Sequence, residues 1–115
     1  MLNTGNNAVA IGAYMIINVP PGIDNISNAQ ADTGFVADPI IEFDDGSSQI
    51  PVQLTTTLAA NGGVRTYSFL AEVPSISVPA HYSFLITANG TSAGSGALVG
   101  PQSTVVIQIC PTGGC

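Results

Sequence analysis

The chain has no lysine and no tryptophan, and Arg65 is its single basic side chain. Charged residues make up 7% of the 115 positions, and seven carboxylates leave a formal net charge of −6. Charged residues are about 25% of a typical soluble protein, so the polar surface must be built mainly from uncharged groups. One basic residue cannot neutralise a phosphate backbone, which excludes nucleic acid as a partner and disfavours binding to an anionic membrane surface.

Long apolar runs are also missing. The most apolar stretch, Ala8 to Ile17, contains Gly12 and Tyr14 and is shorter than the roughly 18 residues that span a bilayer. We therefore expect no transmembrane segment. No basic residue precedes Arg65, so the N-terminus lacks the positive region of a secretory signal. We expect that a signal has been removed or that the protein reaches a surface by another route.

The sequence contains none of the motifs that mark a serine-hydrolase elbow, a phosphate-binding loop, a zinc protease or a dinucleotide site. The only histidine, His81, follows Pro79 at the start of a predicted strand, a position typical of a solvated or hydrogen-bonded structural histidine. We therefore expect a protein that is not an enzyme and needs no cofactor.

A metal site is not expected either. The segment Asp44 to Ser48, with Glu42 nearby, offers oxygen ligands to calcium but lacks the spacing of a calcium-binding loop, which favours an acidic surface turn. Cys110 and Cys115 are too few for structural zinc. They predict either a local disulfide or a cross-link between subunits, and both interpretations place the mature protein in an oxidising environment.

Alternation of apolar and polar residues, broken by Gly, Pro, Asn and Asp, is the dominant pattern along the chain. This pattern is typical of β-strands, and the length is that of one domain. We expect an all-β antiparallel sandwich or jelly roll of about 7–8 strands. The expected parts are an N-terminal arm or first strand at 1–19, a β-sandwich core at 20–110 and a cysteine-containing tail at 111–115.

The clearest alternation, in Ile50 to Leu58, places Ile50, Val52, Leu54 and Leu58 on one face, which we expect to be the buried one. Turn residues and a second alternating run, Tyr67 to Val73, follow, and we expect its odd-numbered residues, including Val73, to face inward. We predict that these two runs form a hairpin. In Phe35 to Phe43 we expect the two terminal phenylalanines and Ile41 to face inward. Asn18 to Gly34 predicts a long connection. The predicted core consists of Leu54, Tyr67, Phe69, Phe84, Ile86, Val105 and Ile107.

The segment Ala8 to Val19 is apolar on both faces, so it must be covered on both sides. It is either a central strand of the sandwich or a strand that pairs with a neighbouring subunit. Under the second interpretation, the residues in contact with the neighbour are Val9, Ile11, Tyr14, Met15 and Ile17.

The chain is small and lysine-free, and its composition is rich in Ser, Thr, Gly, Val and Ile. It also has the apolar arm at Ala8 to Val19, the closing strand Ser103 to Cys110 and the terminal cysteines. In these features it resembles small β-sandwich proteins of bacterial spore surfaces. These are endospore-appendage fibre subunits and the jelly-roll domains of exosporium nap proteins. The resemblance implies stacking through an N-terminal extension and locking by disulfides. The chain departs from the pattern because it has no N-terminal cysteine cluster.

Few charges reduce repulsion between neighbours, which favours homo-oligomerisation. We expect a structural, self-assembling subunit of an extracellular or spore-surface fibre or layer, with itself and other surface proteins as partners. One alternative is a carbohydrate-binding or adhesin-like sandwich that uses calcium at the turn from Glu42 to Asp45. A second alternative is a structural protein of a phage or virus.

Overall fold

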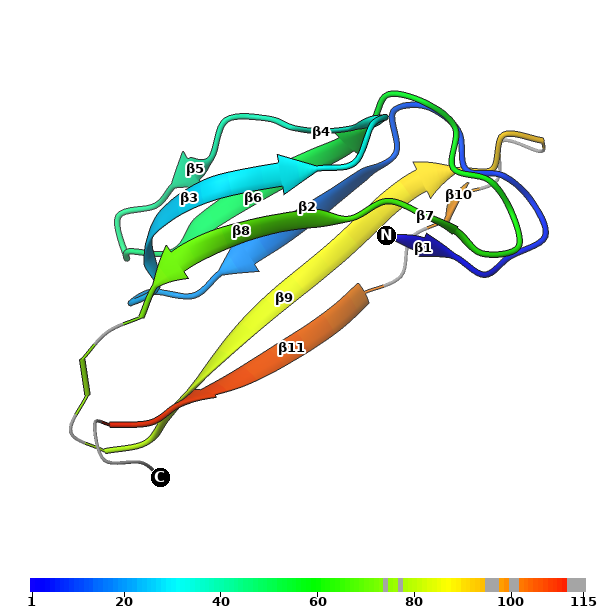
Figure 1. The fold of residues 1–115 in the computed structure, drawn as a ribbon. Coiled ribbons are helices and arrows are strands. Elements are labelled where there is room, and N and C mark those ends of the chain that lie inside the picture. Colours follow the sequence, from blue (N-terminus) through cyan, green and yellow to red (C-terminus); the bar gives the residue numbers. More distant parts are fainter. Residues whose placement is uncertain (74, 77, 95–97, 100–101, 112–115) are drawn as a thin grey trace.

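The computed structural model describes residues 1–73, 75–76, 78–94, 98–99 and 102–111 (Figure 1). Every named element is a strand. The strands are β1 (Leu2–Asn3), β2 (Tyr14–Val19), β3 (Asp24–Ala31), β4 (Phe35–Ala37), β5 (Ile41–Glu42), β6 (Ser48–Leu54), β7 (Gly63–Val64), β8 (Tyr67–Glu72), β9 (Ala80–Thr91), β10 (Leu98–Val99) and β11 (Gln102–Ile109).

A seven-stranded main sheet dominates the fold, with the order β10-β9-β2-β6-β4. β11 also pairs with β9, β5 also pairs with β6, and all these pairings are antiparallel. The molecule is elongated, with extents of 52 × 26 × 23 Å. In the part that the structure describes, no helix is long and apolar enough to cross a bilayer.

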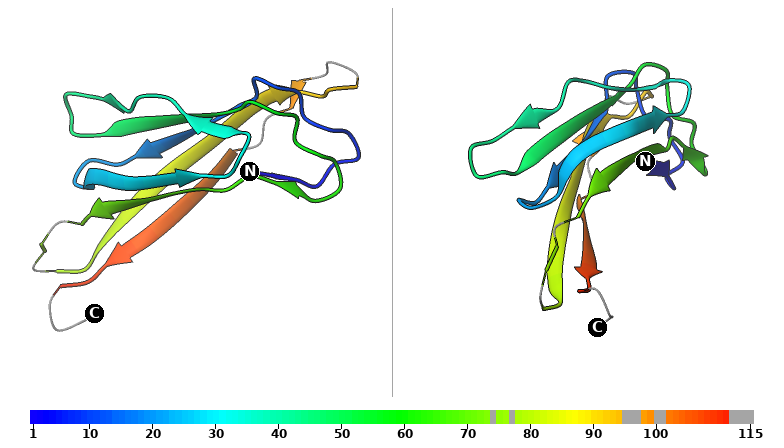
Figure 2. Two further views of the ribbon diagram at one scale, coloured as in Figure 1. Left: turned by 45° about the horizontal axis from the view of Figure 1, so that its top comes forward. Right: turned by 60° about the vertical axis from the view of Figure 1, so that its left-hand side comes forward.

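A second, two-stranded sheet of β3 and β8 lies across one face of the main sheet (Figures 1 and 2). Tyr67, Phe69 and Ala71 of β8 point toward the main sheet and pack against its buried residues. The prediction of an all-β, antiparallel, sandwich-like single domain is confirmed. The two layers are unequal, because the second is much narrower than the first.

Alternation along β6 produces the centre of the core. Its inner residues Ile50, Val52 and Leu54 are fully buried, as is Leu58 beyond the strand end. The predicted inward face of this run is therefore confirmed. Tyr67, Phe69, Phe84 and Ile86 are only partly buried around this centre, Ile107 is half-buried, and the side chain of Val105 lies outside the described residues. The buried core consists of Ala13, Ile17, Val19, Ile23, Phe35, Ile50, Val52, Leu54 and Leu58.

The predicted hairpin of Ile50–Leu58 with Tyr67–Val73 is wrong. β6 pairs with β2, β4 and β5, whereas β8 pairs with β3 in the other sheet. Leu58 lies beyond the end of β6 and bridges Val9. The turn after Leu58 leads into β7, which pairs with β1. Val73, predicted to face inward, is exposed. Turn residues between two strands mark a change of direction but do not specify which sheet the second strand joins.

The long connection predicted for Asn18–Gly34 contains a strand. β3 is mostly exposed, and its pairing with β8 shifts twice, between Asp24 and Ser27 and between Ser27 and Gln30. Asn25 and Asn28 have positive φ values of 52° and 49°, which asparagine tolerates better than most residues. Because the strand is bulged and polar, it carries no regular alternation that a sequence pattern could reveal.

The inward positions predicted for Ile41 and Phe43 are wrong, although Phe35 is buried as predicted. Ala37 lies opposite Val52, and Ile41 lies opposite Gln49. Four residues from β4 to β5 therefore correspond to three residues along β6. This one-residue slip follows the interruption at Pro39, and a slip of one residue moves side chains to the other face. Ile41 and Phe43 are therefore exposed.

Replacing Leu54 with alanine tests the position of the core. Leu54 is 1% exposed, so Leu54→Ala should lower the free energy of unfolding by about 2–5 kcal/mol. Phe84→Ala should cost less than the roughly 3–5 kcal/mol of a fully buried phenylalanine, because Phe84 is only partly buried. Urea denaturation of both variants measures the two losses. A larger loss for Phe84→Ala would place the core around β9 instead of β6.

Candidate interaction surface

The N-terminal segment lies in the middle of the main sheet. β2 pairs with β6 on one side, from Tyr14↔Gln53 to Val19↔Ser48, and with β9 on the other, from Tyr14↔Asn89 to Asn18↔Leu85. Both backbone edges of β2 are therefore paired within the chain. Strand addition by a neighbour to β2, the mechanism suggested by its two apolar faces, has no free edge to use.

The five residues predicted to contact a neighbour fall into two groups. Val9, Met15 and Ile17 pack in the core of their own chain. Ile11 and Tyr14 are 64% and 41% exposed. Ile11 is exposed because the chain turns at Gly12, where φ is +93° and the amide donates to the carbonyl of Leu54. Only Ile11 and Tyr14 are therefore well placed to contact another molecule.

The outer face of the main sheet lies opposite the β3–β8 layer. Residues directly opposite each other in a ladder share a face, so the register assigns Tyr14, Ile16 and Asn18 to this surface, opposite the buried Ile17 and Val19. We call the following residues the outer face: Tyr14, Ile16, Asn18, Val36, Ile41, Gln49, Pro51, Gln53, His81, Ser83, Leu85, Thr87, Asn89, Val106 and Gln108.

No member of the outer face is Asp, Glu, Lys or Arg. Its polar groups are mostly amides and hydroxyls, and some of these bond across strands. The Gln49 side-chain amide donates to Asn18 Oδ1 at 2.8 Å, and Asn18 Nδ2 donates to the Leu85 carbonyl at 2.9 Å. Such bonds hold amide side chains against the sheet, which leaves a regular surface of apolar and uncharged polar groups.

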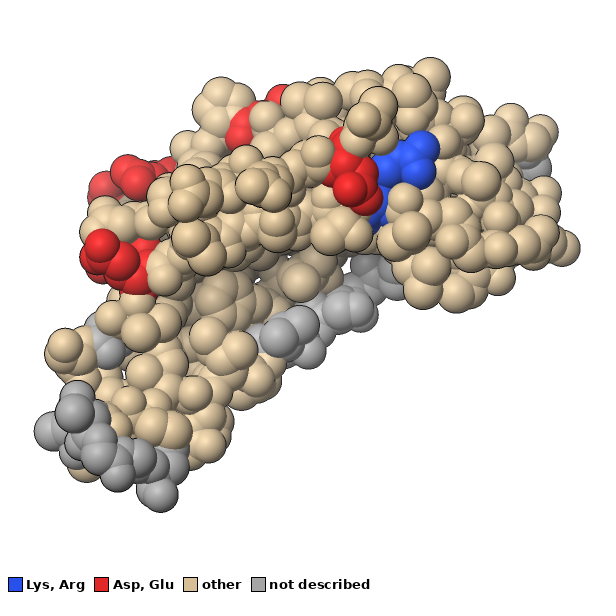
Figure 3. All heavy atoms as spheres, in the orientation of Figure 1, with Lys and Arg blue, Asp and Glu red and all other residues tan. Residues whose placement is uncertain are grey.

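The formal charges lie elsewhere. All seven carboxylates and Arg65 fall between Asp24 and Glu72. In Figure 3 the acidic side chains gather mainly over the end of the molecule away from β10, and the arginine lies beside one acidic residue. There the Asp32 carboxylate accepts a hydrogen bond from the Thr66 amide at 2.8 Å. Arg65 donates to Thr56 Oγ1 and the Thr57 carbonyl.

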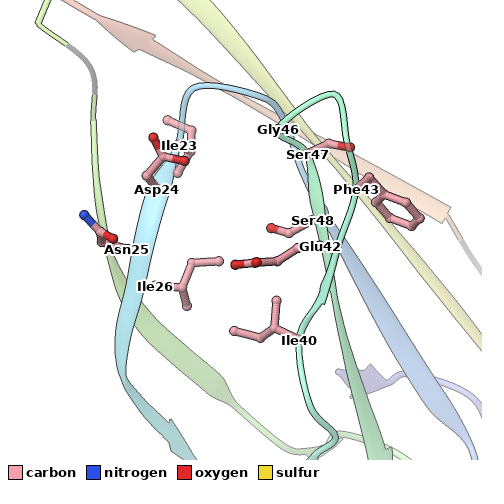
Figure 4. A pocket seen from close by; sticks show the side chains of 10 residues that line it. All are labelled: Ile23, Asp24, Asn25, Ile26, Ile40, Glu42, Phe43, Gly46, Ser47 and Ser48. Atoms are coloured by element: carbon pink, nitrogen blue, oxygen red, sulfur yellow. The ribbon is translucent and has the colours of Figure 1, made fainter.

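A pocket of about 410 Å³ opens between β3 and the β5–β6 turn (Figure 4). Asp24 and Glu42 lie on opposite walls, and Ser48, 8% exposed, lies beside Glu42. Glu42 shares a face with the buried Ser48 through their ladder pairing, so it faces the pocket instead of the outer face. Among the described residues, no group of three or more His, Cys, Asp or Glu side chains is arranged to hold a metal ion.

The acidic turn beside this pocket is ordered by its own hydrogen bonds. The Ser47 hydroxyl and the Ser47 amide both donate to Asp45 Oδ1, the amide at 2.9 Å. These bonds, the hydroxyl first, lower the pKa of Asp45 below its ordinary value of 3.8 because they stabilise the ionised carboxylate. The Asp45 carboxylate therefore accepts hydrogen bonds within its own turn and has a structural role there.

The remaining predicted positions lie at the periphery. His81 is exposed on the outer face, opposite Gln108. Cys110 follows β11 directly, and Cys115 lies outside the described residues, so the disulfide stays a prediction. Asn25 and Asn89, which begin the two Asn-x-Ser/Thr triplets of the sequence, lie in β3 and β9.

No protein family matches the chain, and no curated protein is significantly similar to it.

Deleting residues 1–17 should unfold the protein, because it removes most of the central strand of the main sheet together with the buried Ala13 and Ile17. Circular dichroism and amide chemical-shift dispersion measure the loss of structure. Ile11→Ser is the matched control, since Ile11 lies in the same segment but is exposed, and it should fold normally. A folded deletion variant would show that the segment is dispensable to the core.

The Ser47→Ala substitution should raise the pKa of Asp45 toward 3.8, because it removes the hydroxyl that donates to the carboxylate. Since the folded-state pKa is lowered, the contribution of Asp45 to stability is present above the unfolded pKa and is lost as pH falls through the folded pKa. Titration of Asp45 by NMR measures the shift. Ser48→Ala should leave it unchanged, and an unchanged pKa in Ser47→Ala would contradict the assignment.

Proposed function

We propose that this protein is a self-assembling structural subunit of an extracellular or spore-surface fibre or layer. The observation that carries the proposal is the outer face, a regular β-sheet surface with no formal charge in a chain of net charge −6. Like charges repel when two copies approach, so copies meet at lowest electrostatic cost where neither carries a charge.

Exposed apolar side chains on the outer face also favour the association of two copies. Tyr14, Val36, Ile41 and Val106 are each between 41% and 55% exposed and share this face. Burial of apolar surface contributes about 25 cal/mol per Å², and the amide side chains between these residues can pair with their counterparts on another copy. A surface of this composition can remain hydrated in the monomer and still be covered in an assembly.

Two further considerations support an external location. Cys110 and Cys115 would form a lasting disulfide only in an oxidising environment. A surface whose polarity comes from hydroxyl and amide groups also depends little on pH and ionic strength.

The pocket between β3 and β5 supports a second candidate function, a carbohydrate-binding module. Asp24, Glu42 and Ser48 supply hydrogen-bonding groups, Ile23 and Ile26 supply apolar walls, and the volume of about 410 Å³ is within the range of small-molecule sites. Titration calorimetry with monosaccharides and disaccharides, with and without calcium, tests this candidate. A Glu42→Gln variant that binds sugar as well as the parent would contradict a role for the pocket.

Purified protein should form particles or filaments visible by negative-stain electron microscopy. Because the proposed contacts are uncharged, raising the ionic strength from about 0.01 M to 1 M, which shortens the Debye length from about 30 Å to 3 Å, should leave assembly intact or strengthen it. Sedimentation velocity measures the distribution. Tyr14→Asp should reduce assembly, whereas Leu70→Asp, at a residue 60% exposed on β8, is the control. A monomer at all concentrations and salt strengths would contradict the proposed function.

A further inference from the structure

We infer that the free edge of β11 pairs with β11 of a second copy of this chain, as antiparallel strands related by a two-fold axis. The inference rests on the proposed self-assembly and identifies the first contact in it. In such a pair the two main sheets become one continuous sheet.

The edge is open and regular. Among the described residues, β11 pairs only with β9, without a register shift from Gln102↔Thr87 to Ile109↔Ala80 (Figure 1). β10 pairs with β9 in the same register, through Leu98↔Thr91. On its second edge, the N–H and C=O groups of alternate residues of this eight-residue strand have no strand partner among the described residues, and they form a template for another strand.

The edges of β3, β4–β5 and β8 carry features that usually prevent strand addition. β3 has two register shifts and two asparagines with positive φ. The β4–β5 edge is interrupted at Pro39 and ends at Glu42. β8 ends at Glu72, whose carboxylate accepts a hydrogen bond from Asn25 at 2.7 Å. Bulges, prolines and charges are the common means of blocking edges, and β11 has none of them.

The residues of β11 favour pairing. The strand reads Gln-Ser-Thr-Val-Val-Ile-Gln-Ile, with no charge, proline or glycine and with β-branched residues at five of its eight positions. No Asp, Glu, Lys or Arg occurs from Val73 to Cys115. A charged partner would find no complementary group here, whereas a second copy brings an edge that is equally uncharged.

One end of the β9–β11 pair has no third strand beside it among the described residues. The pairing of β2 with β9 ends at Leu85, so Ala80 to Phe84 pair with β11 alone. This ribbon extends beyond the rest of the main sheet (Figure 2). Two-stranded ribbons are marginally stable, and pairing with a second β11 would embed this one in a wider sheet.

A two-fold axis perpendicular to the sheet keeps the same face of both copies on one side. The two outer faces then join into a single uncharged surface twice as wide. With the axis at the centre of β11, the two Val106 side chains lie opposite each other or one diagonal step apart. A two-fold contact closes on itself, so the pair is a building block, and growth into a fibre or layer would use the joined outer faces.

Charge substitutions at Val106 test the pairing. Val106 is 55% exposed, so Val106→Lys and Val106→Glu should both fold. Each should weaken pairing at least about tenfold, because like charges would meet near the axis. An equimolar mixture of the two variants should recover pairing, since Lys then meets Glu. Leu70→Lys is the control, because Leu70 is 60% exposed on β8, outside the main sheet and its outer face, and it should pair like the parent. Sedimentation equilibrium measures the dissociation constants.

Each result has a defined meaning. Undiminished pairing of Val106→Lys, or no recovery in the mixture, would overturn the β11 pair while leaving self-assembly through another surface intact. A parent protein that is monomeric throughout would overturn both proposals. Amide hydrogen exchange gives a second measurement that needs no substitution. Exchange across 106–109 should slow as protein concentration rises, while exchange across 35–37 should not, and concentration-independent exchange across 106–109 would contradict the pairing.

Discussion

The pairing of β2 on both sides determines where the rest of the chain lies. Its partners, β6 and β9, are distant in sequence, so the sheet forms only when 14–19, 48–54 and 85–89 come together. At Gly90 the packing is so close that an added Cβ would lie 2.5 Å from the Cβ of Ala13, which leaves no room for a side chain. The inner side chains of β2 and β6 then define the core, and the β3–β8 layer covers it. β9, β10 and β11 extend the sheet away from this centre, and the uncharged outer face runs across β2, β4, β5, β6, β9 and β11.

The sequence predicts the fold class and the inward face of β6, because alternation over a whole strand is a strong signal. It also leaves open the possibility that Ala8–Val19 is a central strand, since an apolar segment needs two coverings. It does not predict which strands pair. β6 and β8 look like a hairpin because each alternates and a turn separates them, yet the pairing depends on long-range contacts that no local pattern records.

The positions of surface residues also depend on long-range strand pairing. The slip at Pro39 moves Ile41 to the outer face and directs Glu42 into the pocket, and a pattern that assumes continuous alternation misses both. The absence of charge after Glu72 is visible in the sequence. Its structural consequence is visible only in the register, which places uncharged residues of β9 and β11 on the outer face, next to uncharged residues of β2 and β6, and places β11 at the edge of the sheet.

The chain contains a single bond that trypsin can cut, because it has no lysine and one arginine. Both groups of the Arg65–Thr66 peptide are engaged. The Arg65 carbonyl accepts a hydrogen bond from the Met1 amine at 2.7 Å, and the Thr66 amide donates to Asp32 at 2.8 Å. A protease must first open the β1–β7 region to reach this bond, so the cleavage rate reports the equilibrium opening of that region when reclosing is faster than cutting. The protein thus has a built-in probe of local unfolding.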